Sequence, residues 1–187
     1  MMDSVTLRGK FVQLTTVEPK ELAQAFQRWN QDSEYQRFSM IDPASLLSEE
    51  KIMEWAEKRL QSDGHHYFFA IRLLDSDHLV GSCGLSGEIF PHGEAYVGIG
   101  LGDRELWGKG YGTDAMLVLL RYGFHELNLH RVALTVSAYN PRGIRSYEKA
   151  GFMIEGKARG FLLREGRRWD IVFMGILREE WLSRTQK

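Results

Sequence analysis

Residues 107–113 have the sequence WGKGYGT, in which three glycines alternate with larger residues. The stretch follows a strand-like run and precedes a long apolar segment with helical periodicity, which places it at a strand-to-helix turn. Such glycines leave backbone N–H groups uncovered, and the first turn of a helix adds unpaired N–H donors and a positive dipole end. The combination favours phosphate binding. A glycine-rich tight turn without a ligand is the alternative.

A second group of glycines lies in the strand expected over residues 94–101. Apolar side chains take one face of this strand, whereas Gly98, Gly100 and Gly102 share the other face with Glu94 and Tyr96. Because glycine is depleted in strands, the pattern indicates that another group lies close against the backbone there. A bulged, weakly packed edge strand is the alternative.

The composition is that of an ordinary soluble globular protein. The chain has 187 residues, 43% hydrophobic and 26% charged, and we expect a single domain over residues 1–187. The formal net charge of −1 gives no indication of a nucleic-acid or membrane partner. Neither a secretory leader pattern nor an apolar run of membrane-spanning length is found, so a cytoplasmic location is expected.

No spacing of His, Cys, Asp or Glu residues resembles a metal site, and the chain has a single cysteine. Cys83 is the only cysteine and lies in an alternating apolar run, so we expect a buried strand thiol in a reducing compartment. His65 and His66 are adjacent, which points them apart on a strand, and no His-Glu-x-x-His motif occurs. We expect neither a disulfide framework nor a metal site.

Hydrophobic periodicity and helix caps divide the chain into alternating elements. Strands are expected at 5–15 (or a short hairpin), 66–74, 78–85, 94–101, 131–137, 152–163 and 168–177. Helices are expected over 19–29, 49–61, 112–127 and 141–150 and at the start of 178–184, whereas 30–48 is expected to be a loop with some helical turns. This order predicts an α+β or mixed sheet with helices on both faces.

Two nucleotide-binding motifs fit the glycine turn poorly. A dinucleotide fingerprint requires G-x-G-x-x-G in a βαβ unit, but the spacing here is G-x-G-x-G and the preceding strands look hairpin-connected. A Walker A loop ends in Gly-Lys-Ser/Thr, which is not present. Both hypotheses are therefore weakened.

Three stretches together resemble the GNAT superfamily of acetyl-CoA-dependent N-acetyltransferases. They are GDRELWGKGYGTDA at 102–115, ELNLHRV at 126–132 and NPRGIRSYEKAGF at 140–152. The likeness is greatest to the RimJ/RimL-type branch, whose members acetylate protein N-terminal amines, and it covers roughly residues 95–152. It implies a central, mostly antiparallel twisted sheet. Trp107 stands where the family signature has Gln or Arg.

The resemblance also implies a binding site for acetyl-CoA. The glycine turn would hold the pyrophosphate through backbone donors, the preceding strand would pair with the pantetheine arm, and the later helix would supply an asparagine and two cations. The residues that these roles fall on are Ile99, Gly100, Leu101, Lys109, Gly110, Tyr111, Gly112, Thr113, Asn140, Arg145 and Lys149.

Tyr147 falls where many GNAT enzymes place a tyrosine near the cofactor sulfur. A phenol there could protonate the departing thiolate as a general acid, whereas a core aromatic residue packing on Ile144 is the alternative. The general base is less defined, because Tyr96 occupies the position where this branch commonly has glutamate. Glu94 is the first candidate, and a solvated carboxylate at the strand end is its alternative. The further candidates are His92, Glu88, Glu34 and Tyr35.

The expected activity is direct transfer of acetyl from acetyl-CoA to a primary amine, either a protein N-terminus or a small amine such as a polyamine. A non-catalytic acyl-CoA-binding or sensing module is the alternative. Acidic residues suit a polycation (Asp32, Glu34, Asp42, Glu49, Glu50), and basic residues suit an acidic acceptor (Arg159, Arg164, Arg167, Arg168). Neither group of charged residues identifies the acceptor, since charged faces are usually solvated. Relatives often form homodimers, so a homodimer is one expectation.

Overall fold

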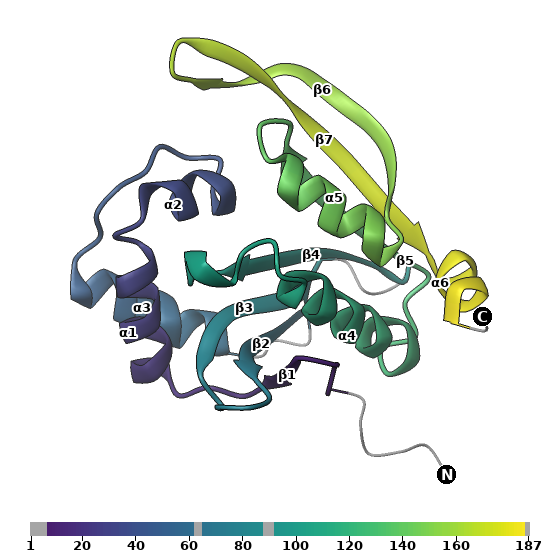
Figure 1. Ribbon diagram of the computed structural model, residues 1–187, viewed down its shortest axis with the longest axis horizontal. Helices are drawn as coiled ribbons and strands as arrows, with labels where there is room; N and C mark the ends of the chain where they lie inside the picture. Colours follow the sequence, from purple (N-terminus) through teal and green to yellow (C-terminus); the bar gives the residue numbers. More distant parts are fainter. Residues whose placement is uncertain (1–6, 62–64, 88–91, 186–187) are drawn as a thin grey trace.

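A seven-stranded sheet forms the centre of the molecule (Figure 1). The computed structural model describes residues 7–61, 65–87 and 92–185. The strand order is β1-β2-β3-β4-β5-β7-β6, and every neighbouring pair is antiparallel except β4 and β5. This confirms the mixed, mostly antiparallel sheet expected from the sequence. The strands are β1 Val12–Thr15, β2 His66–Leu73, β3 Leu79–Ser86, β4 Glu94–Leu101, β5 Arg131–Ser137, β6 Met153–Arg164 and β7 Arg167–Leu177.

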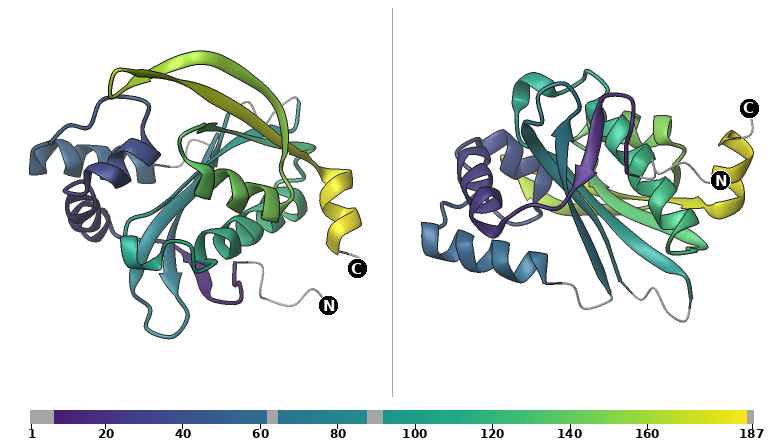
Figure 2. Two further views of the ribbon diagram at one scale, coloured as in Figure 1. Left: turned by 45° about the horizontal axis from the view of Figure 1, so that its top comes forward. Right: turned by 90° about the horizontal axis from the view of Figure 1, so that it is seen from below.

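Helices cover both faces of this sheet (Figure 2). One hydrophobic cluster joins α1 and α3 to one face, and a second joins α4 to the other face together with residues of α5 and α6. In the described ranges, none of the helices combines the length and hydropathy needed to span a bilayer. The helices are α1 Pro19–Trp29, α2 Ser33–Ser39, α3 Glu49–Leu60, α4 Tyr111–His125, α5 Pro141–Ala150 and α6 Arg178–Thr185, with a 3-10 turn η1 at Arg104–Leu106.

Side-chain caps explain where α2, α3 and α5 begin, and a glycine explains where α5 ends. The Ser48 hydroxyl accepts the Lys51 N–H at the start of α3, and the Asn140 side chain accepts the Gly143 N–H at 2.9 Å at the start of α5. Gly151 ends α5 with a left-handed φ of 111°. Asp32 caps α2 in the same way, so the segment expected to be a loop contains a regular seven-residue helix.

The paired stretch between β4 and β5 is short. Only Glu94, Ala95 and Tyr96 of β4 pair with β5, opposite residues 131–133. Beyond Tyr96 the described part of β5 has no ladder pairs with β4, although residues 97–101 remain paired with β3 on the opposite edge. The two strands therefore diverge, and residues 97–101 have no strand partner on the β5 side, where the Leu101 carbonyl accepts the Trp107 indole N–H.

The glycine face of β4 is packed mainly by the chain's own aromatic rings. A Cβ at Gly102 would lie 2.0 Å from the Trp29 ring, and one at Gly100 would lie 3.3 Å from the Tyr35 hydroxyl. At Gly98 nothing lies within 4 Å. The prediction that another group approaches this backbone is confirmed for Gly100 and Gly102, and the groups are side chains of α1 and α2. Pairing of a cofactor with β4 would instead use the strand's free edge.

Candidate active site

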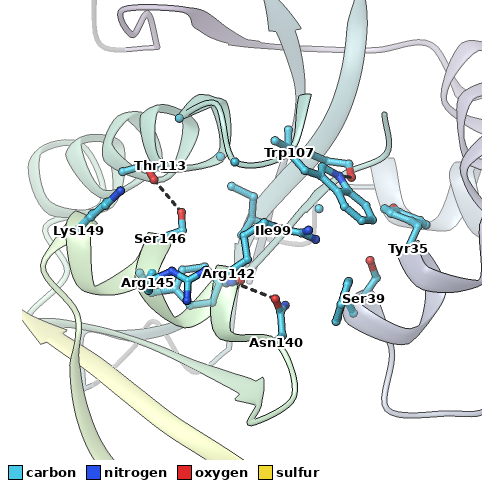
Figure 3. Close-up of a pocket in the computed structure, with 18 residues that line it drawn as sticks. Tyr35, Ser39, Ile99, Trp107, Thr113, Asn140, Arg142, Arg145, Ser146 and Lys149 are labelled. Carbon is cyan, nitrogen blue, oxygen red and sulfur yellow. Dashed lines mark hydrogen bonds between the residues drawn. The ribbon is translucent and has the colours of Figure 1, made fainter. Parts of the chain in front are cut away.

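A cavity of about 260 Å³ lies where the free edge of β4, the glycine turn and α5 meet (Figure 3). The end of α2 lines it from a fourth side. The sequence elements predicted to act together are thus brought around one space. The lining residues are Tyr35, Phe38, Ser39, Ile99, Gly100, Leu101, Trp107, Gly108, Gly110, Gly112, Thr113, Asn140, Arg142, Gly143, Arg145, Ser146, Tyr147 and Lys149.

The glycine turn leaves the start of α4 uncovered. Gly108 and Gly110 have left-handed φ values of 76° and 96°, which favour glycine. A Cβ at Gly108 would have no neighbour within 4 Å, and one at Gly110 only the Phe11 ring at 3.9 Å. Gly110 is the N-cap of α4 and has no side chain to cap the first turn. The N–H donors and dipole of that turn are therefore available to an anion, as a pyrophosphate requires.

Asp114 attaches the N-terminal hairpin to this turn and was not singled out from the sequence. Its carboxylate accepts the backbone N–H groups of Lys10, Phe11 and Val12 at 3.0, 2.7 and 3.1 Å. These bonds hold β1 beside the first turn of α4, where Phe11 contacts Tyr111 edge-on at 5.7 Å. The sequence feature that could have identified Asp114 is its position as an acidic residue in the first turn of a helix.

Helix α5 supplies the opposite wall. Asn140 is buried, and its side chain is used as the helix cap, so its observed role is to fix where α5 begins. Thr113 and Ser146 share a hydrogen bond of 2.8 Å that joins α4 to α5 (Figure 3). Arg145 and Lys149 line the same cavity. The wall therefore places two cations near the uncapped start of α4, a suitable arrangement for a polyphosphate.

Tyr147 also lines the cavity, and its ring packs edge-on against Phe152 at 6.1 Å. The side chain is partly accessible from the cavity, yet burial of the phenol raises its pKa to about 12. The hydroxyl is protonated at neutral pH, as an ordinary phenol also is, and the raised pKa makes it a weaker acid than an ordinary phenol. The core-packing and acid-catalyst interpretations of this residue both agree with its surroundings.

Three of the sequence-predicted residues are not brought to the cavity. Lys109 and Tyr111 are not among the lining residues, although both belong to the turn. Glu94 lies where β4 pairs with β5, and its carboxylate forms an ion pair with Arg131. Arg131 also pairs with Glu155. The structure thus gives Glu94 an ion-pair partner and does not place it beside the cavity.

The other candidate bases are dispersed. Glu34 pairs with Arg104 at 2.7 Å, and Tyr35 lines the cavity with its pKa raised to about 12 by burial. His92 is exposed, and Glu88 lies outside the described residues. The described lining residues include no carboxylate and no histidine. Across the described part of the chain, no group of three or more potential ligand residues could hold a metal ion.

Sequence reasoning missed Arg142, which lies between two aromatic rings. Its guanidinium carbon is 3.9 Å from the ring centroid of Trp107 and 5.1 Å from that of Phe38. Trp107 is fixed in turn by its indole N–H, which donates to the Leu101 carbonyl at 2.8 Å. The arrangement connects α5, the glycine turn and α2 across the cavity.

Polar contacts also join α2 and the segment after it to the tip of the β6–β7 hairpin and to Tyr139, which precedes α5. Arg37 pairs with Glu165 at 2.5 Å, and the Tyr139 hydroxyl donates to the Arg37 carbonyl at 2.6 Å. Arg164 donates to the carbonyls of Ile41 and Asp42. The segment after α2 is thereby bound to the far half of the sheet, on the side of the cavity away from Lys149.

Comparisons with known proteins agree with this architecture. Residues 12–153 match the model of the family described as "Acetyltransferase (GNAT) domain". An uncharacterized N-acetyltransferase p20 of Bacillus licheniformis is 29% identical, covering 94% of this chain and 98% of that protein. A probable N-acetyltransferase YjcK of Bacillus subtilis is 34% identical over 82% and 86% of the two chains.

Solved structures show the same fold. The spermidine N-acetyltransferase of Vibrio cholerae, solved with CoA and spermine, has a TM-score of 0.80. It is 24% identical and covers 91% of this chain and 98% of that one. The family model spans most of the sequence, including β4, the glycine turn and α5, which form the cavity. The chain therefore belongs to the GNAT acetyltransferase family.

Proposed function

We propose that the protein transfers an acetyl group from acetyl-CoA directly to a primary amine. The observation that carries the proposal is that the free edge of β4 and the uncapped start of α4 open into one cavity. An extended amide-containing arm can pair with such an edge, and a pyrophosphate can bind such a helix start. Few ligands other than a CoA thioester have both parts.

In this proposal each wall of the cavity binds one part of the cofactor. Backbone groups on the free edge of the stretch Ile99, Gly100 and Leu101 pair with the pantetheine arm, beside the Leu101 carbonyl that already accepts the Trp107 indole N–H. Backbone N–H groups of residues 109–113 bind the pyrophosphate, and Arg145 and Lys149 add charge to the phosphates. Acetyl-CoA supplies the acetyl group as an activated thioester.

The chain's own residues fit direct transfer better than transfer through an acetyl-enzyme. Cys83, the only cysteine, is buried in β3, and burial raises the pKa of its thiol well above the usual range. Tyr147 lines the cavity and is neutral at pH 7, so in this mechanism its hydroxyl is the donor that protonates the departing thiolate. Since no carboxylate or histidine is found among the described lining residues, the attacking amine loses its proton to water in this mechanism.

The proposed branch within the family is the RimJ/RimL type, and two classes of acceptor follow from the resemblance. One is a protein N-terminal amine, and the other is a small amine such as a polyamine. The Vibrio cholerae protein with the same fold was solved with spermine. At 24% identity this likeness concerns the fold, so the acceptor has to be argued from the cavity of this chain.

Two measurements test the proposal in sequence. Thermal unfolding is followed with CoA, acetyl-CoA or NADH, because a ligand at 100 times its Kd adds about 2.7 kcal/mol to the free energy of unfolding. Thiol release from acetyl-CoA is then measured with a panel of amines. Stabilisation by both CoA compounds followed by amine-dependent thiol release is the expected result. Stabilisation without thiol release for any amine would favour a binding module, and no stabilisation would refute the proposal.

A further inference from the structure

The charged side chains that line the cavity are all cations. In the described part of the chain they are Arg142, Arg145 and Lys149, with no carboxylate among the lining residues. The proposed function assigns Arg145 and Lys149 to the phosphates of CoA. Arg142 is left without an assigned partner, and a polycationic acceptor would bring further positive charge toward it.

Arg142 lies toward the side of the cavity formed by α2. It contacts Phe38 of α2 and Trp107, whereas Thr113 and Lys149 lie on the opposite side (Figure 3). Figure 3 shows Tyr35 and Ser39 on the same side as Trp107. The guanidinium is therefore located between the phosphate-binding wall and the wall that an acceptor would meet.

Three carboxylates near this side are already paired. Asp32 and Glu34 both pair with Arg104, at 2.5 and 2.7 Å, and Glu165 pairs with Arg37. For Arg142, the described residues include no carboxylate within ion-pair distance, and Glu34 acts on it only from farther away. Partial burial lowers the pKa of Arg142, so its charged form is less stable here than in water. A bound anion would compensate this loss.

We propose that the acceptor is a small amine with a carboxylate close to its reacting nitrogen, and that Arg142 binds this carboxylate. The inference rests on the acetyl transfer proposed above. A guanidinium binds a carboxylate through two parallel hydrogen bonds, and contact with aromatic rings positions it without using its N–H donors. The ring of Trp107, which could otherwise contact an ammonium group, already has Arg142 and Arg104 over it, at 3.9 and 5.5 Å.

The competing explanation is that Arg142 binds the phosphates of CoA together with Arg145 and Lys149. The two explanations differ in what the variant Arg142→Gln changes. An acceptor-binding role changes the selectivity among amines and leaves the Kd for CoA within twofold of wild type. A phosphate-binding role raises the Kd for CoA, as we expect for the matched control Arg145→Gln on the same helix.

The experiment measures thiol release with a panel of L-amino acids, the corresponding amino-acid amides and spermidine. Replacing the carboxylate of an amino acid by an amide lowers the pKa of the neighbouring amine and so increases the fraction of free base that can react. This effect favours the amides and therefore biases the comparison against the proposal. We expect kcat/KM for the best amino acid to exceed that of its amide by about tenfold or more, as a charge-assisted hydrogen bond provides. In Arg142→Gln this ratio falls to about twofold, and Arg142→Lys restores part of it.

Several results would overturn the inference. Preference for spermidine, or no turnover of any amino acid in the panel, would exclude a carboxylate-bearing acceptor of this class. An increase in the Kd for CoA equal to that of Arg145→Gln would assign Arg142 to the cofactor. Each of these leaves the proposed acetyl transfer standing, whereas failure of the wild type to bind CoA would refute both proposals.

Discussion

Replacing Gly112 by alanine separates binding from folding at the glycine turn. Gly112 is the second residue of α4 and lines the cavity. A Cβ added there would meet its nearest neighbour, the Leu101 Cδ1, at 3.5 Å, which is an ordinary van der Waals contact. Its backbone is not in the left-handed region, unlike that of Gly108 and Gly110. The folded chain therefore accommodates the methyl group.

The expected effects on stability and on binding have opposite signs. Gly→Ala at a compatible site reduces the entropy of the unfolded chain and stabilises by about 0.4–1 kcal/mol. For a domain of this size that raises the Tm by about 1–4 °C. The same methyl group occupies space beside the first-turn N–H donors. Loss of one charge-assisted hydrogen bond, about 1.5–3 kcal/mol, raises the Kd for CoA by roughly 10- to 150-fold.

Calorimetric titration with CoA and thermal unfolding of the free protein measure the two effects separately. Gly156→Ala is the matched control, because Gly156 lies on β6 outside the cavity and has nothing within 4 Å of an added Cβ. We expect its Kd for CoA to equal that of wild type. A Gly112→Ala protein with raised Tm and unchanged CoA affinity would show that the turn does not bind the phosphates. A lowered Tm would contradict the packing argument.

Two further predictions concern the glycine face of β4 and the phenol in the cavity. Gly102→Ala places a Cβ 2.0 Å from the Trp29 ring and is expected to lower the free energy of unfolding, measured in urea, by about 1–3 kcal/mol or more. In the control Gly98→Ala the added Cβ has no neighbour within 4 Å, and the free energy of unfolding is expected to stay within about 0.5 kcal/mol of wild type. Equal effects of the two substitutions would exclude ring packing as the cause. Tyr147→Phe is expected to lower kcat by about 10²–10⁴-fold. The phenol donates only while it is protonated, and burial raises its pKa to about 12. The wild-type kcat should therefore not fall as the pH rises to about 10. A fall near pH 10 that is absent from the variant would contradict this pKa.

Local signals in the sequence were sufficient for most of the fold. The bounds of β4 and β5 match the expected strands, and the Ser48 and Asn140 caps begin helices where predicted. These features depend on residues within a few positions of one another. The helix α2 was expected only as helical turns, because seven residues are too few to show an apolar period, although Asp32 was an available capping signal.

The site was predictable where it depends on backbone conformation and less so where it depends on contacts between distant segments. Glycines 108 and 110 have the left-handed φ values that explain their residue type. The face of β4 that carries Glu94 was assigned correctly, but the pairing of Glu94 with Arg131 depends on the register with β5. The contact of Arg142 with Phe38 requires α2 to lie against α5, which no local pattern indicates.

The short paired stretch between β4 and β5 has a consequence for self-association. An unpaired strand edge normally invites the edge of another chain and so promotes aggregation. Here the unpaired segment, residues 97–101, lies in the middle of the strand order, with β5 diverging beside it and α5 across the cleft. Because the sheet continues through β5, a neighbouring molecule cannot add its sheet here as it could at an outer edge, whereas a single extended chain can lie in the cavity. The fold thus retains the hydrogen-bonding capacity of an open edge while excluding the partners that make such edges hazardous.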